Sequence, residues 1–124
     1  MPRETSEFIV VTTTVGSERE ARELAAAVVG AKLAACVQCV PVHSTYRWKG
    51  VVESAAEFLL LAKTRASLAD ALTAFIRGRH SYELPEIVVT PIVGGLAPYL
   101  QWIRDETNID AARECGKYIG ETAE

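Results

Sequence analysis

Hydrophobic residues follow two periods along the chain, and these periods predict strands and helices in turn. The run from Phe8 to Thr14 is β-branched and nearly continuous, which is typical of a strand buried on both faces. Ser17, with Glu20 three residues later, has the pattern of a helix capping box, and Gly30 stands where that helix would end. Between them, apolar residues recur at the spacing of one helix face: Ala21, Leu24, Ala25, Val28 and Val29.

The middle of the chain predicts further strands. Leu33 to Val42 is an apolar run, and its Pro41 favours a sheet edge because proline has no N–H to donate to a neighbouring strand. From 44 to 53, aromatic and polar residues alternate around Lys49-Gly50, which predicts a projecting β-hairpin. Glu57 to Thr64 is expected to form a third, strongly apolar strand.

The second half of the chain returns to a helix followed by a strand. Ser67, with Asp70 three residues later, predicts the start of a second helix, and Gly78 predicts its end. The buried stripe of this helix would consist of Leu68, Ala71, Leu72, Phe75 and Ile76. A fourth strand is expected from Glu86 to Val93, in which Pro91 marks an edge or a bulge.

A short third helix is expected from Tyr99 to Glu106, with Pro98 in its first turn. The pattern weakens in 109–124, which we interpret as a loosely attached tail. This order predicts the α+β class: a ferredoxin-like βαββαβ sandwich, with an antiparallel sheet and a short C-terminal helix. Two helices cover only one face of such a sheet, so its apolar open face predicts self-association.

Composition excludes several classes of function. The chain of 124 residues fits one domain (1–124, with its core at about 8–108), and it is 49% hydrophobic and 23% charged. A net charge of -3 argues against nucleic acid as a partner. The apolar run 58–62 is too short to span a membrane, and residues 1–7 lack an apolar signal region, so we expect no membrane partner and a cytoplasmic location. Three cysteines, an odd number, favour reduced thiols.

The strongest candidate for metal binding is the segment between the second helix and the fourth strand. It carries His80, Glu83 and Glu86, and imidazole with carboxylate suits zinc, copper or nickel. The structural alternative is that Glu86 pairs with a backbone or basic group and that His80 packs beside Tyr82. Three ligands from one loop would need a tight turn or a second subunit.

Two other groups of potential ligands are weaker candidates. Cys36 and Cys39 have C-x-x-C spacing, but in a strand positions i and i+3 face opposite ways, so they cannot chelate one ion. We interpret Cys36 as a buried structural cysteine. His43, just past Pro41, could join a metal site across a subunit interface, or it could be an ordinary surface histidine.

Aromatic and basic residues leave two further alternatives open. Tyr46 and Trp48 are two residues apart and share one face of a strand, where they form either a ligand platform or interface packing. Basic residues end the third strand and the second helix, and they form either helix-end contacts or the rim of an anion-binding cleft. These residues are Lys63, Arg65, Arg77 and Arg79. The sequence has no Gly-rich phosphate loop, nucleophile elbow or His-Glu-x-x-His motif.

Four motifs in order resemble the CutA family of divalent cation tolerance proteins. They are Lys32-Leu33-Ala34-Ala35-Cys36-Val37, Tyr46-Arg47-Trp48-Lys49-Gly50, His80-Ser81-Tyr82-Glu83-Leu84-Pro85-Glu86 and Tyr99-Leu100-Gln101-Trp102. The resemblance covers roughly residues 8 to 108. It implies a ferredoxin-like subunit, a tight homotrimer and a non-enzymatic role in tolerance of copper and other divalent cations, with no required cofactor.

The chain departs from the family pattern at positions that bear on metal binding. Some bacterial members carry a cysteine of a proposed copper site where this chain has Thr13. The family's His-His-Pro-Tyr motif is Arg79-His80-Ser81-Tyr82 here, and arginine cannot coordinate a metal. One imidazole with carboxylates is a less selective ligand set for copper than a thiolate with two imidazoles.

Two hypotheses follow. The first is a trimeric, metal-responsive protein that binds copper or another divalent cation weakly at His80, Glu83 and Glu86. The second is a trimeric sensor that, like the nitrogen-regulatory PII proteins it resembles in architecture, binds a small anionic metabolite in clefts between subunits.

Overall fold

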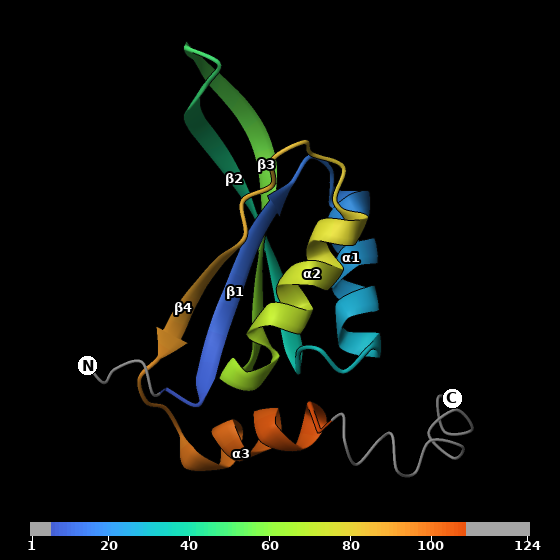
Figure 1. Ribbon diagram of the computed structural model, residues 1–124, viewed down its shortest axis with the longest axis vertical. Helices are drawn as coiled ribbons and strands as arrows, with labels where there is room; N and C mark the ends of the chain where they lie inside the picture. The colour runs from blue at the N-terminus through green and yellow to red at the C-terminus, as the bar shows by residue number, and fades with distance from the viewer. Residues whose placement is uncertain (1–5, 109–124) are drawn as a thin grey trace.

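The computed structural model describes residues 6–108, which form one antiparallel sheet and three α-helices (Figure 1). The strands are β1 (Phe8–Val15), β2 (Cys36–Trp48), β3 (Val51–Arg65) and β4 (Val88–Ile92). The helices are α1 (Glu18–Gly30), α2 (Ala69–Arg79) and α3 (Ala97–Glu106), with one 3₁₀ turn, η2 (Ala66–Leu68). The strand order β2-β3-β1-β4 confirms the predicted ferredoxin-like α+β arrangement. The predicted tail, 109–124, lies outside the described residues.

The core lies between the sheet and the pair α1 and α2, which cover one of its faces (Figure 1). Side chains alternate faces along a strand, so Val11 and its partner Ala62 both point toward these helices. The core residues are Ile9, Val11, Val15, Ala21, Leu24, Val28, Leu33, Ala34, Leu60, Ala62, Leu72 and Ile76. Burial of a large aliphatic side chain contributes about 1.5–3 kcal/mol, so this cluster is a major favourable term in folding.

Strands β2 and β3 form one long hairpin, which corrects the prediction of a strand, a separate hairpin and another strand. Pairing is continuous from Cys36 opposite Lys63 to Trp48 opposite Val51. Pro41 does not interrupt it, because β2 is an edge strand and Pro41 needs no partner for an N–H on its outer side. The hairpin extends well beyond the rest of the sheet (Figure 1).

The helix ends confirm one predicted cap and correct another. The Ser17 hydroxyl accepts a hydrogen bond from the Glu20 N–H at 3.1 Å, as predicted for an N-cap. Ser67 is no cap: it lies in η2, and α2 begins two residues later without a side-chain cap. The sheet pairing explains the delay, because the Ala66 N–H still donates to the Glu7 carbonyl at 2.7 Å. The predicted stop at Gly78 is one residue early, since α2 ends at Arg79.

Helix α3 lies at the end of the sheet opposite the hairpin tip (Figure 1). The Arg104 guanidinium donates to both carboxylate oxygens of Glu7, at 2.7 and 2.8 Å. The Arg65 side chain donates to the Thr107 hydroxyl at 2.9 Å and also to its carbonyl. The hydrogen bond from Arg104 lowers the pKa of Glu7 below its ordinary value. These contacts attach α3 to the start of β1 and to the end of β3.

The face of the sheet opposite α1 and α2 carries exposed apolar side chains. Register places Val40 on this open face beside Leu59, and it is 43% exposed. Val88, opposite Thr12, lies on the same face and is 46% exposed. Among the described residues, α3 reaches only the end of the sheet, so most of the open face has no cover within the subunit.

Candidate functional site

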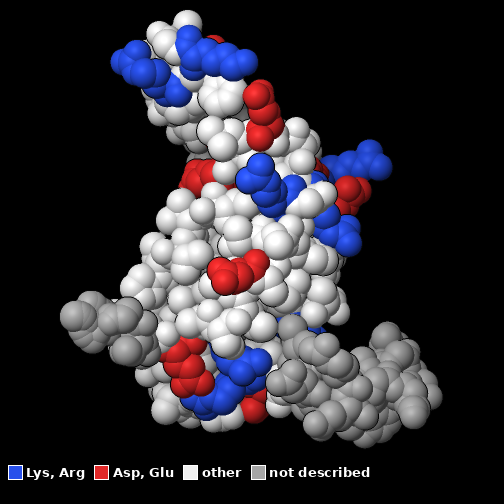
Figure 2. Space-filling view, viewed as in Figure 1, with Lys and Arg blue, Asp and Glu red and all other residues white. Residues whose placement is uncertain are grey.

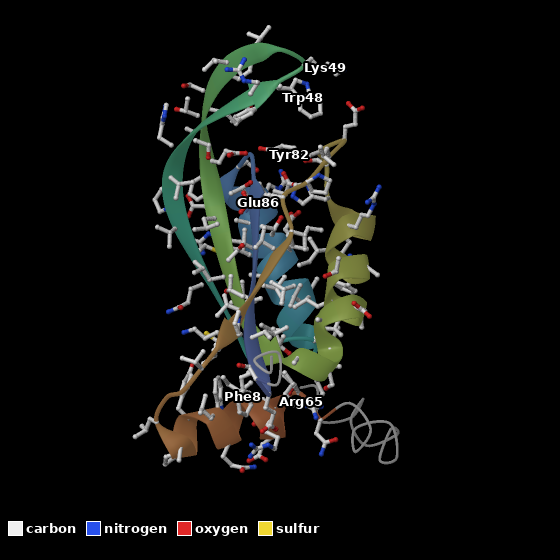
Figure 3. The ribbon with its side chains drawn as sticks, turned by 60° about the vertical axis from the view of Figure 1, so that its left-hand side comes forward. Phe8, Trp48, Lys49, Arg65, Tyr82 and Glu86 are labelled. Carbon is white, nitrogen blue, oxygen red and sulfur yellow. The ribbon has the colours of Figure 1, made fainter. Side chains whose placement is uncertain are left out.

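A cavity of about 720 Å³, called the hairpin-root cavity below, lies between the part of the β2–β3 hairpin that projects beyond β1 and the loop that joins α2 to β4. Its lining residues are Thr14, Ser44, Thr45, Tyr46, Trp48, Glu57, Ser81, Tyr82, Glu83, Leu84 and Glu86. Four predicted candidates, Tyr46, Trp48, Glu83 and Glu86, therefore meet in one place, although they come from separate parts of the chain. His80 lies beside the cavity, next to Tyr82, and is not among its lining residues. Figure 3 shows Trp48 on the hairpin above the loop that carries Tyr82 and Glu86.

Strand geometry explains why the hairpin residues reach this cavity. Ser44, Tyr46 and Trp48 are spaced two apart, so they point to the same side of β2. Pairing of Val42 with Glu57 puts the Glu57 side chain on that side as well. The cavity therefore opens on the face of the sheet that α1 and α2 leave bare.

Tyr82 and Glu57, which both line the cavity, are joined by a hydrogen bond. The Tyr82 hydroxyl donates to the Glu57 carboxylate at 2.7 Å. Burial, and then this hydrogen bond to a negative group, raise the pKa of Tyr82 well above its ordinary value. The Tyr82 hydroxyl packs close to Gly16, where an added Cβ would lie 3.4 Å from the hydroxyl oxygen. Glu57 itself is only 7% exposed.

His80 is held by hydrogen bonds at both ring nitrogens. Its Nε2 lies 2.9 Å from the carbonyl oxygen of Thr14, and a carbonyl only accepts, so Nε2 carries the proton. Nδ1 then accepts from the Tyr82 N–H at 3.1 Å. The His80 and Tyr82 rings also pack together, with centroids 4.9 Å apart. This is the packing that the structural alternative predicts, and a metal could bind His80 only by displacing one of these partners.

Glu83 and Glu86 are exposed and line the cavity with Glu57. In residues 6–108, however, no three His, Cys, Asp or Glu side chains are grouped closely enough to hold a metal ion. The proposed set of His80, Glu83 and Glu86 therefore stays a prediction, one that needs movement of the loop or ligands from a second subunit. Sequence analysis missed Glu57, whose only signal was a carboxylate at the start of an apolar strand.

The remaining candidates lie away from the cavity. Cys36 pairs with Lys63 and Cys39 with Leu60, so the two thiols face opposite sides of β2, as predicted. Both are free, and Cys36 is half-buried, which corrects the prediction of a buried cysteine. Burial raises the pKa of Cys39. His43 is exposed and is not among the residues that line the cavity.

The basic residues that could form the rim of an intersubunit anion cleft, the alternative to helix-end contacts, do not line this cavity within the described subunit. The Lys63 ammonium lies 5.7 Å from the centroid of the Tyr99 ring, and the Arg79 guanidinium 4.4 Å from that of Phe75. Neither Lys nor Arg is among the lining residues, which include three glutamates. Figure 2 shows Lys and Arg side chains gathered at the hairpin tip instead. Within one subunit, the cavity therefore favours a positively charged ligand.

Comparison with known proteins gives a consistent match. Residues 9–106 match the family model described as CutA1 divalent ion tolerance protein. The chain is 45% identical over 100 residues to protein CutA 1, chloroplastic, of Oryza sativa subsp. japonica, which covers 80% of this chain and 56% of the rice protein. It is 46% identical over 99 residues to the divalent-cation tolerance protein CutA of Thermus thermophilus, which covers 79% of this chain and 96% of that protein.

The fold agrees with a solved structure from a third organism. The periplasmic divalent cation tolerance protein CutA of Archaeoglobus fulgidus superposes with a TM-score of 0.80 at 34% identity, covering 82% of this chain and 99% of that chain. The rice relative is described as chloroplastic and the Archaeoglobus relative as periplasmic, and no location is given in the name of the Thermus relative. The predicted cytoplasmic location therefore stays a prediction. The chain spans about half the length of the rice protein. No helix within 6–108 is long and apolar enough to cross a membrane.

Proposed function

Since this chain belongs to the CutA1 family of divalent ion tolerance proteins, we propose that it is a non-enzymatic homotrimer that binds divalent cations weakly at the hairpin-root cavity. The observation that carries this proposal is the set of three carboxylates around one cavity, from Glu57, Glu83 and Glu86, with no Lys or Arg among the lining residues. Carboxylates of one sign in a partly enclosed space raise the local concentration of cations.

The donor set favours weak binding with little selectivity. Carboxylate and hydroxyl oxygens are hard ligands, whereas copper selectivity comes from thiolate and imidazole. The position that carries a cysteine in some relatives is Thr13, which is 1% exposed and faces the helices rather than the cavity. His80 would join the site only if the metal displaced the Tyr82 N–H from Nδ1 or if the ring turned away from Thr14.

Assembly through the open face would complete the site. The exposed valines at positions 40 and 88 are apolar surface that a neighbouring subunit can bury, and β2 and β4 are both edge strands with free outer sides in the described subunit. The cavity opens on this same face. A neighbouring subunit packed there would add further metal ligands beside Glu83 and Glu86. In a trimer, one repeated contact would bury the open face of each subunit and complete each metal site.

The alternative function is a trimeric sensor of a small anionic metabolite. The cavity has the volume of a small-molecule site, which supports a sensor in general. Its carboxylate lining opposes an anion unless a neighbouring subunit contributes Lys or Arg. A thermal-shift screen of divalent metals against nucleotides and organic acids separates the two, because a ligand that binds only the native state raises the melting temperature.

Calorimetric titration with copper and zinc tests the proposed site. We expect a Glu83→Gln/Glu86→Gln double variant to bind divalent metal on the order of tenfold more weakly, because two charges leave the cavity. Glu23→Gln is the matched control, since Glu23 is an exposed glutamate on α1 paired with Arg19. His80→Ala tests the imidazole separately. Unchanged metal affinity in both site variants would reject the assignment.

A further inference from the structure

Glu57 is a buried carboxylate without a cationic partner among residues 6–108. It is 7% exposed, and its recorded hydrogen bond comes from the Tyr82 hydroxyl, a neutral donor. None of the ion pairs formed within residues 6–108 includes it. A buried charge is costly unless a counter-charge or several donors compensate it. The geometry therefore indicates that a positive group approaches Glu57 from the cavity it lines.

Besides carboxylates, the cavity presents aromatic rings to a positive group. Tyr46, Trp48 and Tyr82 line it, so aromatic rings are contributed from the hairpin and from the facing loop. Aromatic faces attract organic cations, and carboxylates with hydroxyls accept hydrogen bonds from an ammonium group. A bare divalent ion uses the oxygen ligands but gains little from three aromatic rings.

The chain itself shows an ammonium group at one of these rings. The Lys49 Nζ lies 5.4 Å from the centroid of the Trp48 ring, within the range of a cation–π contact. Figure 3 shows both residues at the hairpin end above Tyr82. Lys49 is not among the lining residues, and its position shows that a primary ammonium can reach the Trp48 ring.

We propose that the hairpin-root cavity binds an aliphatic amine in its ammonium form, with the cationic nitrogen between the Glu57 carboxylate and the aromatic rings. The alkyl chain would lie along Tyr46, Trp48 and Leu84, which are the large apolar surfaces of the lining. A volume of about 720 Å³ accommodates such a molecule and is far larger than a metal ion needs. This inference deepens the proposed function, because it concerns the same cavity and the same preference for positive charge.

The test is calorimetric titration of the native assembly with n-butylammonium chloride. The matched probes are 1-butanol, which keeps the alkyl chain without the charge, and sodium chloride, which keeps the ionic strength. We expect saturable binding of n-butylammonium and none of 1-butanol. Trp48→Leu should weaken binding about fivefold because it removes a cation–π face while keeping an apolar side chain. Glu57→Gln, which still accepts from Tyr82, should weaken it about tenfold or more.

Two controls keep this inference separate from metal binding. Trp102→Leu changes an exposed tryptophan on α3 that does not line the cavity, so its affinity for n-butylammonium should equal that of the wild type. Zinc affinity, measured in parallel for each variant, reports metal binding separately from amine binding. Equal binding of 1-butanol, or unchanged amine affinity in both Trp48→Leu and Glu57→Gln, would overturn the proposal. Amine binding without metal binding would reject the proposed function alone, and metal binding without amine binding would reject this inference alone.

Discussion

The hydrogen bond from Tyr82 to Glu57 joins the α2–β4 loop to the long hairpin across 25 positions of sequence. This hydrogen bond gives the buried Glu57 carboxylate one donor, which compensates part of its loss of solvation. His80 adds a second tie from the same loop, to the carbonyl of Thr14 at the end of β1. At this scale, the loop is positioned by polar contacts, and the cavity exists because these contacts hold.

Tyr82→Phe removes the donor and leaves the ring in place. We expect the free energy of unfolding to fall by about 1–3 kcal/mol, because Glu57 loses its recorded partner while it stays buried. Urea denaturation at one protein concentration measures the change. Tyr99→Phe is the control, since Tyr99 is 37% exposed and its hydroxyl makes no hydrogen bond within residues 6–108. This substitution should shift stability by less than about 0.5 kcal/mol. Equal effects of the two substitutions would contradict the role of this contact.

The same contact predicts a dependence on alkaline pH. The pKa of Tyr82 is raised in the folded protein, so between about 10, the ordinary tyrosine value, and the higher folded value the native state binds more protons than the unfolded state. The stability that Tyr82 contributes is therefore complete below about pH 10 and is lost as the pH rises further. The gap in stability between wild type and Tyr82→Phe should narrow from pH 8 to pH 11. A constant gap would contradict the raised pKa.

Residue-level chemistry was only partly predictable from the sequence. The closeness of His80, Tyr82 and Glu83 in the sequence predicted a functional site in this loop. The partners that decide how His80 behaves could not be predicted, because Thr14 is 66 positions away and the contact depends on how the loop folds over β1. Glu57 escaped notice because one carboxylate in an apolar strand gives no local sign that it faces a cavity.

At the scale of elements, the hairpin positions half of the cavity, and its turn depends on two residues with positive φ. Lys49 has φ 51° and Gly50 has φ 84°, as the tight turn between right-twisted strands requires. The dipeptide was recognisable as a turn from sequence. The length of the hairpin was not, because Pro41 suggested an end, and only the edge position of β2 makes proline acceptable within the strand.

Gly50→Ala tests this turn. An alanine at φ 84° is strained by about 1–2 kcal/mol, so the free energy of unfolding should fall by that amount. Gly78→Ala is the matched control: Gly78 lies within α2, an added Cβ meets nothing within 4 Å, and alanine there should raise stability by up to about 1 kcal/mol. Thermal or urea unfolding at equal concentrations compares them. A loss of stability in Gly78→Ala, or none in Gly50→Ala, would contradict the description of the backbone.

Helix ends show where local rules suffice and where they do not. The cap at Ser17 was predictable because the preceding strand ends at Val15 and the helix starts freely. The equivalent serine at position 67 fails as a cap because the chain is still attached to the sheet through the Ala66 N–H. Tertiary pairing thus moves an element boundary that the sequence pattern places elsewhere.

For the whole molecule, the open face of the sheet dominates the argument. Alternation in the strands predicted a sandwich with helices on one side, and the described residues have that arrangement. Which molecule covers the other side depends on surfaces of a second chain, which no local pattern encodes. The proposed trimer therefore rests on exposed apolar residues and on membership of the family, and it calls for a direct test.

Val88→Glu places a charge on the open face and should disrupt assembly. We expect sedimentation to show a trimer for the wild type and smaller species for this variant, because an unpaired charge in an apolar interface is strongly unfavourable. Val29→Glu is the matched control: Val29 is 40% exposed, against 46% for Val88, but it lies on α1, on the other side of the sheet. Its sedimentation should equal that of the wild type. A trimeric Val88→Glu, or a dissociated Val29→Glu, would place the interface elsewhere.

The most direct test of the central claim is a crystal structure of the native protein soaked with zinc, with anomalous data collected at the zinc edge. The account predicts three subunits that face one another through their open sheet faces and an anomalous peak within coordination distance of Glu83 or Glu86 in the hairpin-root cavity. A peak bound only at other residues, or a packing that leaves the open faces uncovered, would contradict it.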